Sequence, residues 1–498
     1  MKVFLMFKDR DLDLQQALPV NEQDLTQDLE LNTLINAMAM GDQFLFDVIK
    51  PILLNGLDSL EEIKYRQEVL KDCLKNPAVI REIYQIPIKC IKSKNARWMG
   101  IFTHSASGVL SSSVNLMEMF VDLLRMLKQI ADTYAENFES EGFTQFFAMI
   151  KKELNDEYFS IVDNHLKQLK FKSGVLLSAE LGKGNEATNL TLRLPNEKNP
   201  NWIKNVFSKK PATYSFIISE RDDAGTRALS DMKDKGMNLA ANALAQSADH
   251  IDSYISMLRN ELAFYIGCIN LHEQLSSMES PITFPRPVPP GERCHAFRGF
   301  YDVCLALTMK GKIVGNEIDA NNKNLVLITG ANQGGKSTFL RSIGLAQMMM
   351  QAGMFVSAQD FSANLSTGVF THYKRKEDIT MKSGKLDEEL TRMSTIVDNI
   401  SPNALILFNE SFASTNELEG SEIARQITSA LMDRKIKVFF VTHMYEFARK
   451  YLEKGRKDVI FLRAERKSSG RRTFRLVEGD PLPTSYGVDV YNAVFGKE

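Results

Sequence analysis

Apolar residues recur at steps of three and four positions through much of the first 280 residues, which is the pattern of helices with one buried face. The clearest stripe lies within residues 28–171 and consists of Leu116, Phe120, Leu123, Leu124, Leu127 and Ile130. A second long helical stretch is predicted at residues 222–278. Such stripes are typical of core packing, so we assign no catalytic residue to residues 28–171.

The pattern changes between these two helical regions. Residues 172–219 contain the segments GVLLSAEL, NLTLRL and TYSFIIS, in which apolar residues alternate or cluster near glycines. This texture predicts a small β-rich insertion. Residues 1–280 are therefore expected to form a mainly α-helical core and lever domain. Five prolines within residues 281–292 then predict a stiff linker, because proline cannot continue a helix.

Beyond the linker, short apolar runs alternate with helical patterns. The runs are LVLIT (325–329), LILF (405–408), VFFVT (438–442) and VIFL (459–462). Continuous apolar strands separated by helices predict a parallel sheet covered on both faces. Residues 293–498 should form an α/β domain whose chemistry lies at the carboxyl ends of its strands.

The first of these strands runs directly into a glycine-rich segment. It reads Gly330-Ala331-Asn332-Gln333-Gly334-Gly335-Lys336-Ser337-Thr338 and leads into a helical pattern. The spacing GxxxxGK[ST] between a strand and a helix is typical of a P-loop, whose backbone N–H groups face phosphate oxygens. Lys336 is expected to reach the β and γ phosphates, and Ser337 to offer its hydroxyl to Mg²⁺. The segment therefore predicts a P-loop ATPase domain that binds ATP with Mg²⁺.

Two later strands end in polar residues that suit the same chemistry. LILF is followed by Asn409 and Glu410, where P-loop ATPases place a metal-shell carboxylate and a general base. Glu410 is the predicted base, and the uncharged Asn409 predicts weaker Mg²⁺ binding or slower turnover. VFFVT ends at His443, which is expected to sense or orient the γ-phosphate. The alternatives are that Glu410 caps a strand end and that His443 is structural.

A further helix is predicted to begin after Ser383 and to run to about residue 399, with Ser383 as its N-cap and acidic residues in its first turn. The other histidines, among them His295 and His372, have no comparable context and are taken as core or surface residues.

Composition limits the function classes. At 498 residues the chain exceeds a single hydrophobic core, and 44% hydrophobic with 25% charged residues is typical of a soluble globular protein. The formal net charge of −1 means that any nucleic-acid contact must come from a local basic patch. Five cysteines without a CxxC pair favour a reducing cytoplasm over a zinc site or disulfide framework. No apolar stretch reaches the length of a membrane span.

Two basic clusters are candidates for such a patch. One consists of Lys89, Lys92, Lys94 and Arg97, and the other of Arg463, Arg466, Lys467, Arg471, Arg472 and Arg475. Neither has interleaved aromatic residues for base stacking, so a solvated face is the favoured interpretation of each.

Taken together, these motifs resemble the MutS DNA mismatch-repair ATPases, which belong to the ABC ATPase superfamily. The resemblance is strong in the phosphate-loop segment, in the stretch from Asn409 to Gly420, in Thr442-His443 and in the segment 484–487, TSYG. It is weaker in the helical segments 28–54 and 65–77. The resemblance implies an ABC-type ATPase fold over the C-terminal part and covers nearly the whole chain.

The resemblance also implies a way of working. ATP would be held between two copies of the chain, with Ser383 reaching the γ-phosphate of the partner's nucleotide. Closure of this homodimer would move the helical arms on DNA. The family's mismatch-sensing module carries Phe-x-Glu ahead of the core, whereas here that pattern occurs only at Phe408-Asn409-Glu410. A short form without the mismatch-recognition and connector domains is therefore expected.

The sequence thus predicts a MutS-like, DNA-binding ATPase that acts as a homodimer on branched or otherwise unusual DNA in repair or recombination. The alternative is an ATP-gated switch or scaffold that hydrolyses slowly and acts on a protein partner without DNA. Asn409 and the missing mismatch module favour the alternative. Glu410, His443 and the helical core favour the first interpretation.

Overall fold

The computed structural model describes residues 1–98, 105–172, 174–194, 214–219, 221–331, 333–375, 384–466, 472–482 and 495. The chain folds into two compact units that interleave along the sequence. Unit 1 comprises Met1–Val3, Arg81–Phe138 and Thr144–Arg259, and unit 2 comprises Phe4–Ile80, Glu139–Phe143 and Asn260–Glu498.

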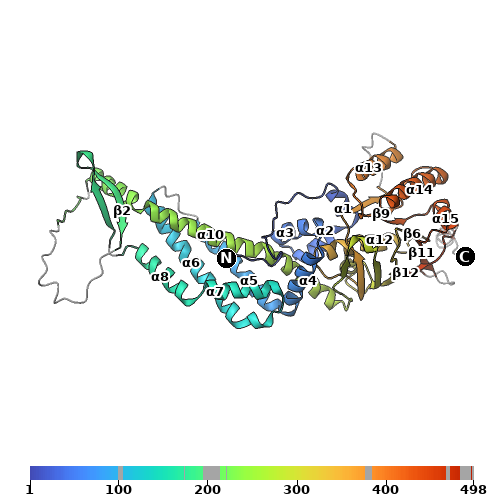
Figure 1. The fold of residues 1–498 in the computed structure, drawn as a ribbon, viewed down its shortest axis with the longest axis horizontal. Coiled ribbons are helices and arrows are strands. Elements are labelled where there is room, and N and C mark those ends of the chain that lie inside the picture. The colour runs from blue at the N-terminus through green and yellow to red at the C-terminus, as the bar shows by residue number, and fades with distance from the viewer. Residues whose placement is uncertain are drawn as a thin grey trace. The chain divides into compact units, whose positions relative to one another are not determined.

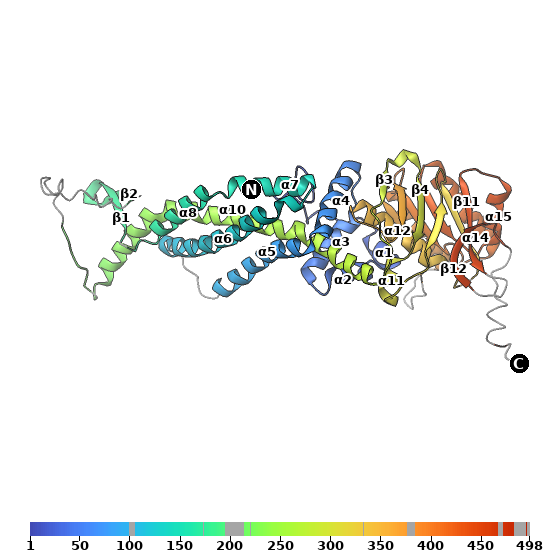
Figure 2. The same ribbon diagram turned by 90° about the horizontal axis from the view of Figure 1, so that it is seen from below.

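Unit 1 is a helical bundle. Helices α6 (Ala106–Tyr134) and α8 (Asp156–Leu169) lie within it, and it also contains much of α5 (Pro77–Trp98), α7 (Glu141–Glu153) and α10 (Asp223–Ser277). Figures 1 and 2 show α6, α8 and α10 running alongside one another. The predicted stripe on α6 is buried, with Phe120, Leu124 and Leu127 all at 1% exposure or less. The helical period therefore marks the face that packs into the bundle.

The predicted β-rich insertion contains a two-stranded antiparallel hairpin. Strands β1 (Leu176–Leu181) and β2 (Ala187–Arg193) flank the short 3-10 turn η2 (Lys183–Asn185), and the hairpin lies at one end of the bundle in Figure 1. Residues 214–219 differ from the expectation, because they form no strand and their side chains Tyr214, Phe216 and Ile217 are exposed. An apolar run without a neighbouring strand to pair with does not form a sheet.

Unit 2 contains a six-stranded sheet of order β12-β11-β6-β10-β9-β8. Its strands are β6 (Leu325–Thr329), β8 (Val369–Tyr373), β9 (Leu405–Asn409), β10 (Lys437–Val441), β11 (Val459–Arg466) and β12 (Arg472–Glu478). All neighbours are parallel except the edge strand β12, which runs antiparallel to β11. The parallel sheet predicted from four apolar runs is confirmed, and β6 and β10 are buried along their whole length. Strand β8 has the sequence VFTHY, whose mixture of apolar and polar residues does not predict a strand.

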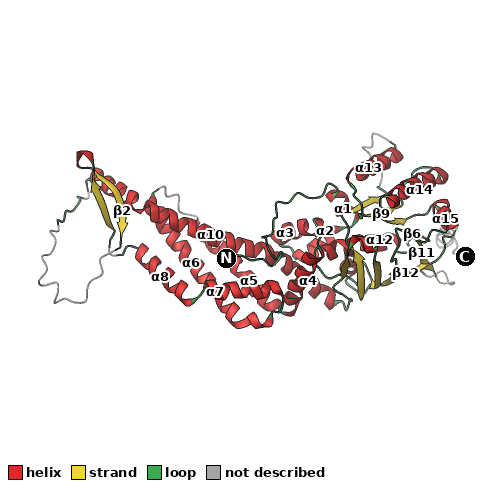
Figure 3. Cartoon of the chain, viewed as in Figure 1, coloured by secondary structure: helices red, strands yellow, loops and turns green. Residues whose placement is uncertain are grey.

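Helices pack around this sheet, as the colouring of Figure 3 shows. They include α11 (Val303–Met309), α12 (Lys336–Gln351), α13 (Lys385–Asn399), α14 (Glu417–Asp433) and α15 (Tyr445–Glu453). Unit 2 also contains the N-terminal helices α1 (Glu22–Asp28), α2 (Leu31–Ala39), α3 (Gln43–Leu54) and α4 (Leu60–Lys75). One core cluster under α14 and α15 is built around Phe408, Phe440 and Phe447.

A second sheet of unit 2 has the order β3-β7-β4-β5. It consists of β3 (Arg286–Val288), β4 (His295–Phe300), β5 (Asn316–Asp319) and β7 (Asp360–Asn364). The segment expected to be a stiff linker thus supplies an edge strand, which pairs with β7, and the short 3-10 turn η3 (Pro290–Glu292). Pro287 is tolerated in β3 because an edge strand has a neighbouring strand on one side only, so its other side needs no N–H donor. None of the helices in the described part of the chain is long and apolar enough to cross a lipid bilayer.

Candidate nucleotide-binding site

The glycine-rich segment forms the turn between β6 and α12. Its backbone is left-handed at Gly330 (φ 110°), Gln333 (φ 58°) and Gly335 (φ 89°). Glycine adopts this region without steric cost, whereas Gln333 is a non-glycine residue in it. Asn332 lies outside the described residues. The turn delivers the chain into α12, whose first-turn N–H groups have no acceptor within the helix. Such a turn with free amides can bind an anion.

Lys336 lies at the start of α12 and is buried, at 5% exposure. Its Nζ donates hydrogen bonds to the carbonyl oxygens of Gly330 and Ala331, each at 2.9 Å. Burial lowers the pKa of Lys336 to about 8, while the Glu410 carboxylate opposes that shift and the Arg472 guanidinium adds to it. The ammonium is therefore held across the turn by neutral carbonyls, which a phosphate oxygen could replace.

Ser337 and Asn409 join the start of α12 to the end of β9. The Ser337 Oγ donates a hydrogen bond of 3.0 Å to Asn409 Oδ1, and Ser337 is exposed to solvent. Hydroxyl and amide oxygens are hard ligands of the kind that Mg²⁺ prefers. Thr338 follows as a half-buried residue of the same turn. The pair is placed where a cation could bridge the two elements, which fits the predicted Mg²⁺ ligands.

Glu410 and His443 form the second polar pair. His443 Nε2 lies 2.9 Å from Glu410 Oε1, and both side chains are about one-third exposed. The hydrogen bond from His443 holds the pKa of Glu410 below its usual range against the opposing effect of burial, and Lys336 and Lys374 add smaller contributions. Glu410 has a positive φ of 55°. The carboxylate is therefore ionised near neutral pH, as a general base must be.

Sheet order explains why these residues meet. Strands β6, β10 and β9 are consecutive neighbours and parallel, so their carboxyl ends lie at one edge of the sheet. That edge carries the phosphate-loop segment after β6, His443 after β10, and Asn409 with Glu410 at the end of β9. The structure thus brings together residues that are more than a hundred positions apart in the sequence. Their individual roles stay predictions.

The start of α13 corrects one expectation. Its N-cap is Gly384, which offers no side-chain cap, and Ser383 lies outside the described residues. The helix does end at Asn399, as its pattern indicates. Glu389, on this helix, accepts hydrogen bonds from the Phe412 amide at 2.7 Å and the Ser414 hydroxyl at 3.0 Å. The sequence does not predict the burial of Glu389, because an acidic residue on a helix usually faces solvent.

The two histidines taken as core or surface residues are both buried. His372 contacts the Ser411 hydroxyl at 2.7 Å and the Glu389 carbonyl at 3.0 Å, and burial lowers its pKa to about 4. Burial also lowers the pKa of His295 well below its usual range. Both are therefore neutral core residues at physiological pH.

Two protein-family models match this chain. The model of the MutS2 N-terminal domain matches residues 58–278, and that of MutS domain V matches residues 326–496. The DNA mismatch repair protein MutS of Clostridium kluyveri is 24% identical over 426 residues, which are 80% of this chain and 48% of that protein. The chain belongs to the MutS family.

Other MutS proteins align over shorter or similar lengths. The DNA mismatch repair protein MutS of Thermus aquaticus is 30% identical over 179 residues, 36% of this chain and 22% of that protein. That of Methanosarcina mazei is 23% identical over 445 residues, 80% of this chain and 48% of that protein. The chain thus spans about half the length, or less, of these MutS relatives. The MutS domain V match begins inside β6 and includes the glycine-rich turn, Asn409, Glu410 and His443.

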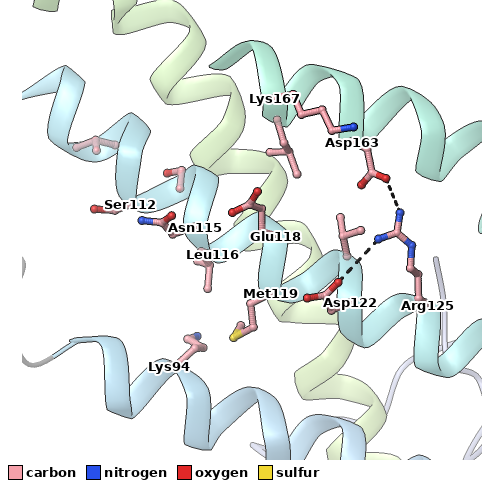
Figure 4. Close-up of a pocket in the computed structure, with 14 residues that line it drawn as sticks. Lys94, Ser112, Asn115, Leu116, Glu118, Met119, Asp122, Arg125, Asp163 and Lys167 are labelled. Atoms are coloured by element: carbon pink, nitrogen blue, oxygen red, sulfur yellow. Dashed lines mark hydrogen bonds and ion pairs between the residues drawn. The ribbon is translucent and has the colours of Figure 1, made fainter. Parts of the chain in front are cut away.

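The part of this MutS chain matched by the MutS2 N-terminal model contains a groove of a different character. It lies in unit 1 among α5, α6 and α8 and encloses about 910 Å³. Figure 4 shows Arg125 of α6 reaching Asp163 of α8, a contact of 2.6 Å, and Lys94 of α5 pairs with Asp252 at 2.8 Å. Two cations of its lining, Arg125 and Lys94, are therefore paired with carboxylates, whereas Lys336 of unit 2 contacts neutral carbonyl oxygens.

Proposed function

We propose that this MutS-family chain is a Mg²⁺-dependent ATPase that acts on DNA as a homodimer. The observation that carries the proposal is the convergence at one sheet edge of the phosphate-loop turn, the Ser337–Asn409 pair at 3.0 Å and the Glu410–His443 pair at 2.9 Å. A cation, a metal-ligand pair and an ionised base around one helix N-terminus are the parts that phosphoryl transfer to water needs.

Binding depends on the turn and its lysine. Gly334, Gly335 and the first turn of α12 would present amides to the phosphates, together with Gln333 and Thr338 from the same segment. Lys336 would exchange its two carbonyl acceptors for phosphate oxygens. Ser337 and Asn409 would hold Mg²⁺, which supplies charge neutralisation on the phosphates when bound. Ala331 and Asn332 complete the turn in this proposal.

Hydrolysis depends on Glu410. Its carboxylate would accept the proton of the attacking water, while the hydrogen bond from His443 fixes the orientation of the carboxylate. The same hydrogen bond keeps Glu410 ionised, which a base requires. Asn409 adds no charge to the metal shell, so we expect slow turnover.

The DNA partner is inferred from the names of the relatives, and the second subunit from the resemblance to the MutS family. Several of the proteins that this chain resembles are named DNA mismatch repair proteins. We infer that two copies close over ATP, that Ser383 reaches the partner's nucleotide, and that the helices of unit 1 carry the resulting motion to DNA. Repair or recombination on unusual DNA structures is the corresponding process.

Titration calorimetry with MgATP tests the site. We expect saturable binding by the wild type and its loss in Lys336→Ala, with thermal unfolding of the variant close to that of the wild type. Gel-mobility shifts with duplex, mismatched, junction and single-stranded DNA at low salt then test the partner, since electrostatic binding is strongest there. Absence of heat from MgATP would refute the ATPase. Absence of any DNA shift would refute the DNA function.

One observation favours a second candidate, an ATP-gated switch that acts on a protein partner. Asn409 occupies the metal-shell position without a charge, and its amide is already bonded to Ser337. A protein with this site would bind MgATP, turn over very slowly and show no shift with any of the four DNAs. Detectable turnover that DNA stimulates would exclude it.

A further inference from the structure

The hairpin formed by β11 and β12 continues past the end of β6 and lies against the phosphate-loop turn. In the sheet, Arg463 of β11 is paired with Thr329, the last residue of β6. The next residue of β11, Ala464, is therefore level with the turn itself. The hairpin is one wall of the proposed nucleotide site.

The contact between hairpin and turn is close enough to require glycine. A Cβ atom added at Gly330 would lie 3.0 Å from the Ala464 amide nitrogen, and one at Gly334 would lie 2.6 Å from the Ala464 Cβ. A Cβ at Gly335 would lie 3.6 Å from the Phe474 carbonyl oxygen. Gly334 has no positive φ, so its requirement for glycine comes from close neighbours, namely Ala464 of the hairpin and the Ala331 carbonyl oxygen at 3.0 Å.

Arg472 is the hairpin's charged contribution to this wall. It is half-buried at the start of β12, and its Nη1 donates a hydrogen bond of 2.7 Å to Gln333 Oε1. Gln333 is an exposed residue of the turn with left-handed backbone. A guanidinium has five N–H donors, and this hydrogen bond to a neutral amide occupies one of them.

Two cations contact the same turn. Lys336 donates to the carbonyl oxygens of Gly330 and Ala331, and Arg472 donates to the side chain of Gln333. Arg472 donates to a neutral amide, and an anion is a stronger acceptor, because charge-assisted hydrogen bonds are about twice as strong as neutral ones. The planar fork of arginine also matches phosphate geometry.

We propose that Arg472 is a nucleotide-binding residue, which releases Gln333 and donates to a phosphate oxygen of the bound nucleotide. This inference rests on the proposed ATPase function and adds to the phosphate-loop residues a cation 139 residues beyond Gln333. No covalent bond changes, because one hydrogen-bond acceptor of the guanidinium replaces another.

Calorimetric titration of MgATP into four variants of the full chain tests this role. Arg472→Gln is expected to weaken binding by about tenfold or more, as loss of a hydrogen bond between charged groups does. Arg472→Lys keeps the charge but lacks the planar guanidinium, so its MgATP affinity should lie between those of the wild type and Arg472→Gln. Arg449→Gln removes the same charge from the surface of α15, where Arg449 pairs with Glu453, and should bind like the wild type. The fourth variant, Gln333→Ala, separates two roles.

If Arg472 binds phosphate, Gln333→Ala loses less MgATP affinity than Arg472→Gln, since it removes only the acceptor and leaves the guanidinium to reach the phosphate. Equal losses in Gln333→Ala and Arg472→Gln would show that Arg472 only anchors the hairpin and would overturn the inference. Wild-type affinity in Arg472→Gln would overturn it as well, while leaving the ATPase function intact. Failure of the wild type to bind MgATP would refute both the ATPase function and the role of Arg472. The two claims can therefore fail separately.

Discussion

The groove of unit 1 and the strand-end site of unit 2 both contain charged residues, but the hydrogen-bond partners of their cations differ. In the groove, Arg125 and Lys94 each face a carboxylate, Asp163 at 2.6 Å and Asp252 at 2.8 Å. In the site, Lys336 donates to two backbone carbonyls and Arg472 to an amide oxygen. Cations with neutral partners gain when an anion arrives, and paired cations do not. The two regions therefore differ in whether their cations are paired with carboxylates, and this difference favours anion binding in unit 2.

The largest expected effect is on turnover. Glu410→Gln should reduce steady-state ATP hydrolysis by about 10²- to 10⁴-fold, because the amide cannot accept the proton of water. MgATP affinity should stay close to that of the wild type, since the carboxylate serves the reaction and not the phosphates. Glu453→Gln on α15 is the control. Unchanged hydrolysis in Glu410→Gln would assign the base to another residue.

The next effect is on pH dependence. In the free protein the pKa of Lys336 is lowered to about 8, and a bound phosphate would raise it, so the lysine takes up a proton on binding above pH 8. MgATP affinity should be full below pH 8 and should fall by up to about tenfold per unit as the pH rises through 8. Calorimetry in buffers of different ionisation enthalpy measures the proton uptake.

Lys336→Arg is the control for that pH dependence, because arginine stays charged. The variant should lose the proton uptake between pH 8 and 9 even where its affinity is lower. Proton uptake that persists in Lys336→Arg would assign the titration to another group.

A smaller change of opposite sign is expected at the metal position. Asn409→Asp adds a carboxylate beside Ser337, and a charged acceptor contributes about 1 kcal/mol more than a neutral one. Mg²⁺ should then support ATP binding at a concentration roughly fivefold lower. Titration of Mg²⁺ at fixed ATP measures this. A higher Mg²⁺ requirement in Asn409→Asp would show that residue 409 is not near the metal.

The smallest effect is expected in the groove. Asp163→Asn removes the partner of Arg125 from a partly exposed ion pair, which should lower the free energy of unfolding by less than about 1 kcal/mol. Thermal or urea unfolding measures the loss. MgATP affinity should not change. A clear loss of nucleotide affinity in Asp163→Asn would break the contrast between the two regions.

Local sequence determined the elements that carry the site. Residues 325–329, 405–409, 437–441 and 459–466 are strands because continuous apolar runs can be buried on both faces of a parallel sheet. The spacing from Gly330 to Thr338 between a strand and a helix predicts an anion-binding turn, because glycine permits the left-handed backbone at Gly330 and Gly335. The resemblance to MutS rested on the same residues, and the family comparisons confirmed it.

Tertiary structure alone decided which distant residues meet. Nothing in the local pattern orders β6 beside β10 and β10 beside β9, yet that order places His443 against Glu410 and Asn409 against Ser337. It also made a proline-rich connection into an edge strand and brought Arg472 to Gln333. Periodicity reports how each segment is buried, whereas strand order depends on long-range packing that no short window of sequence contains.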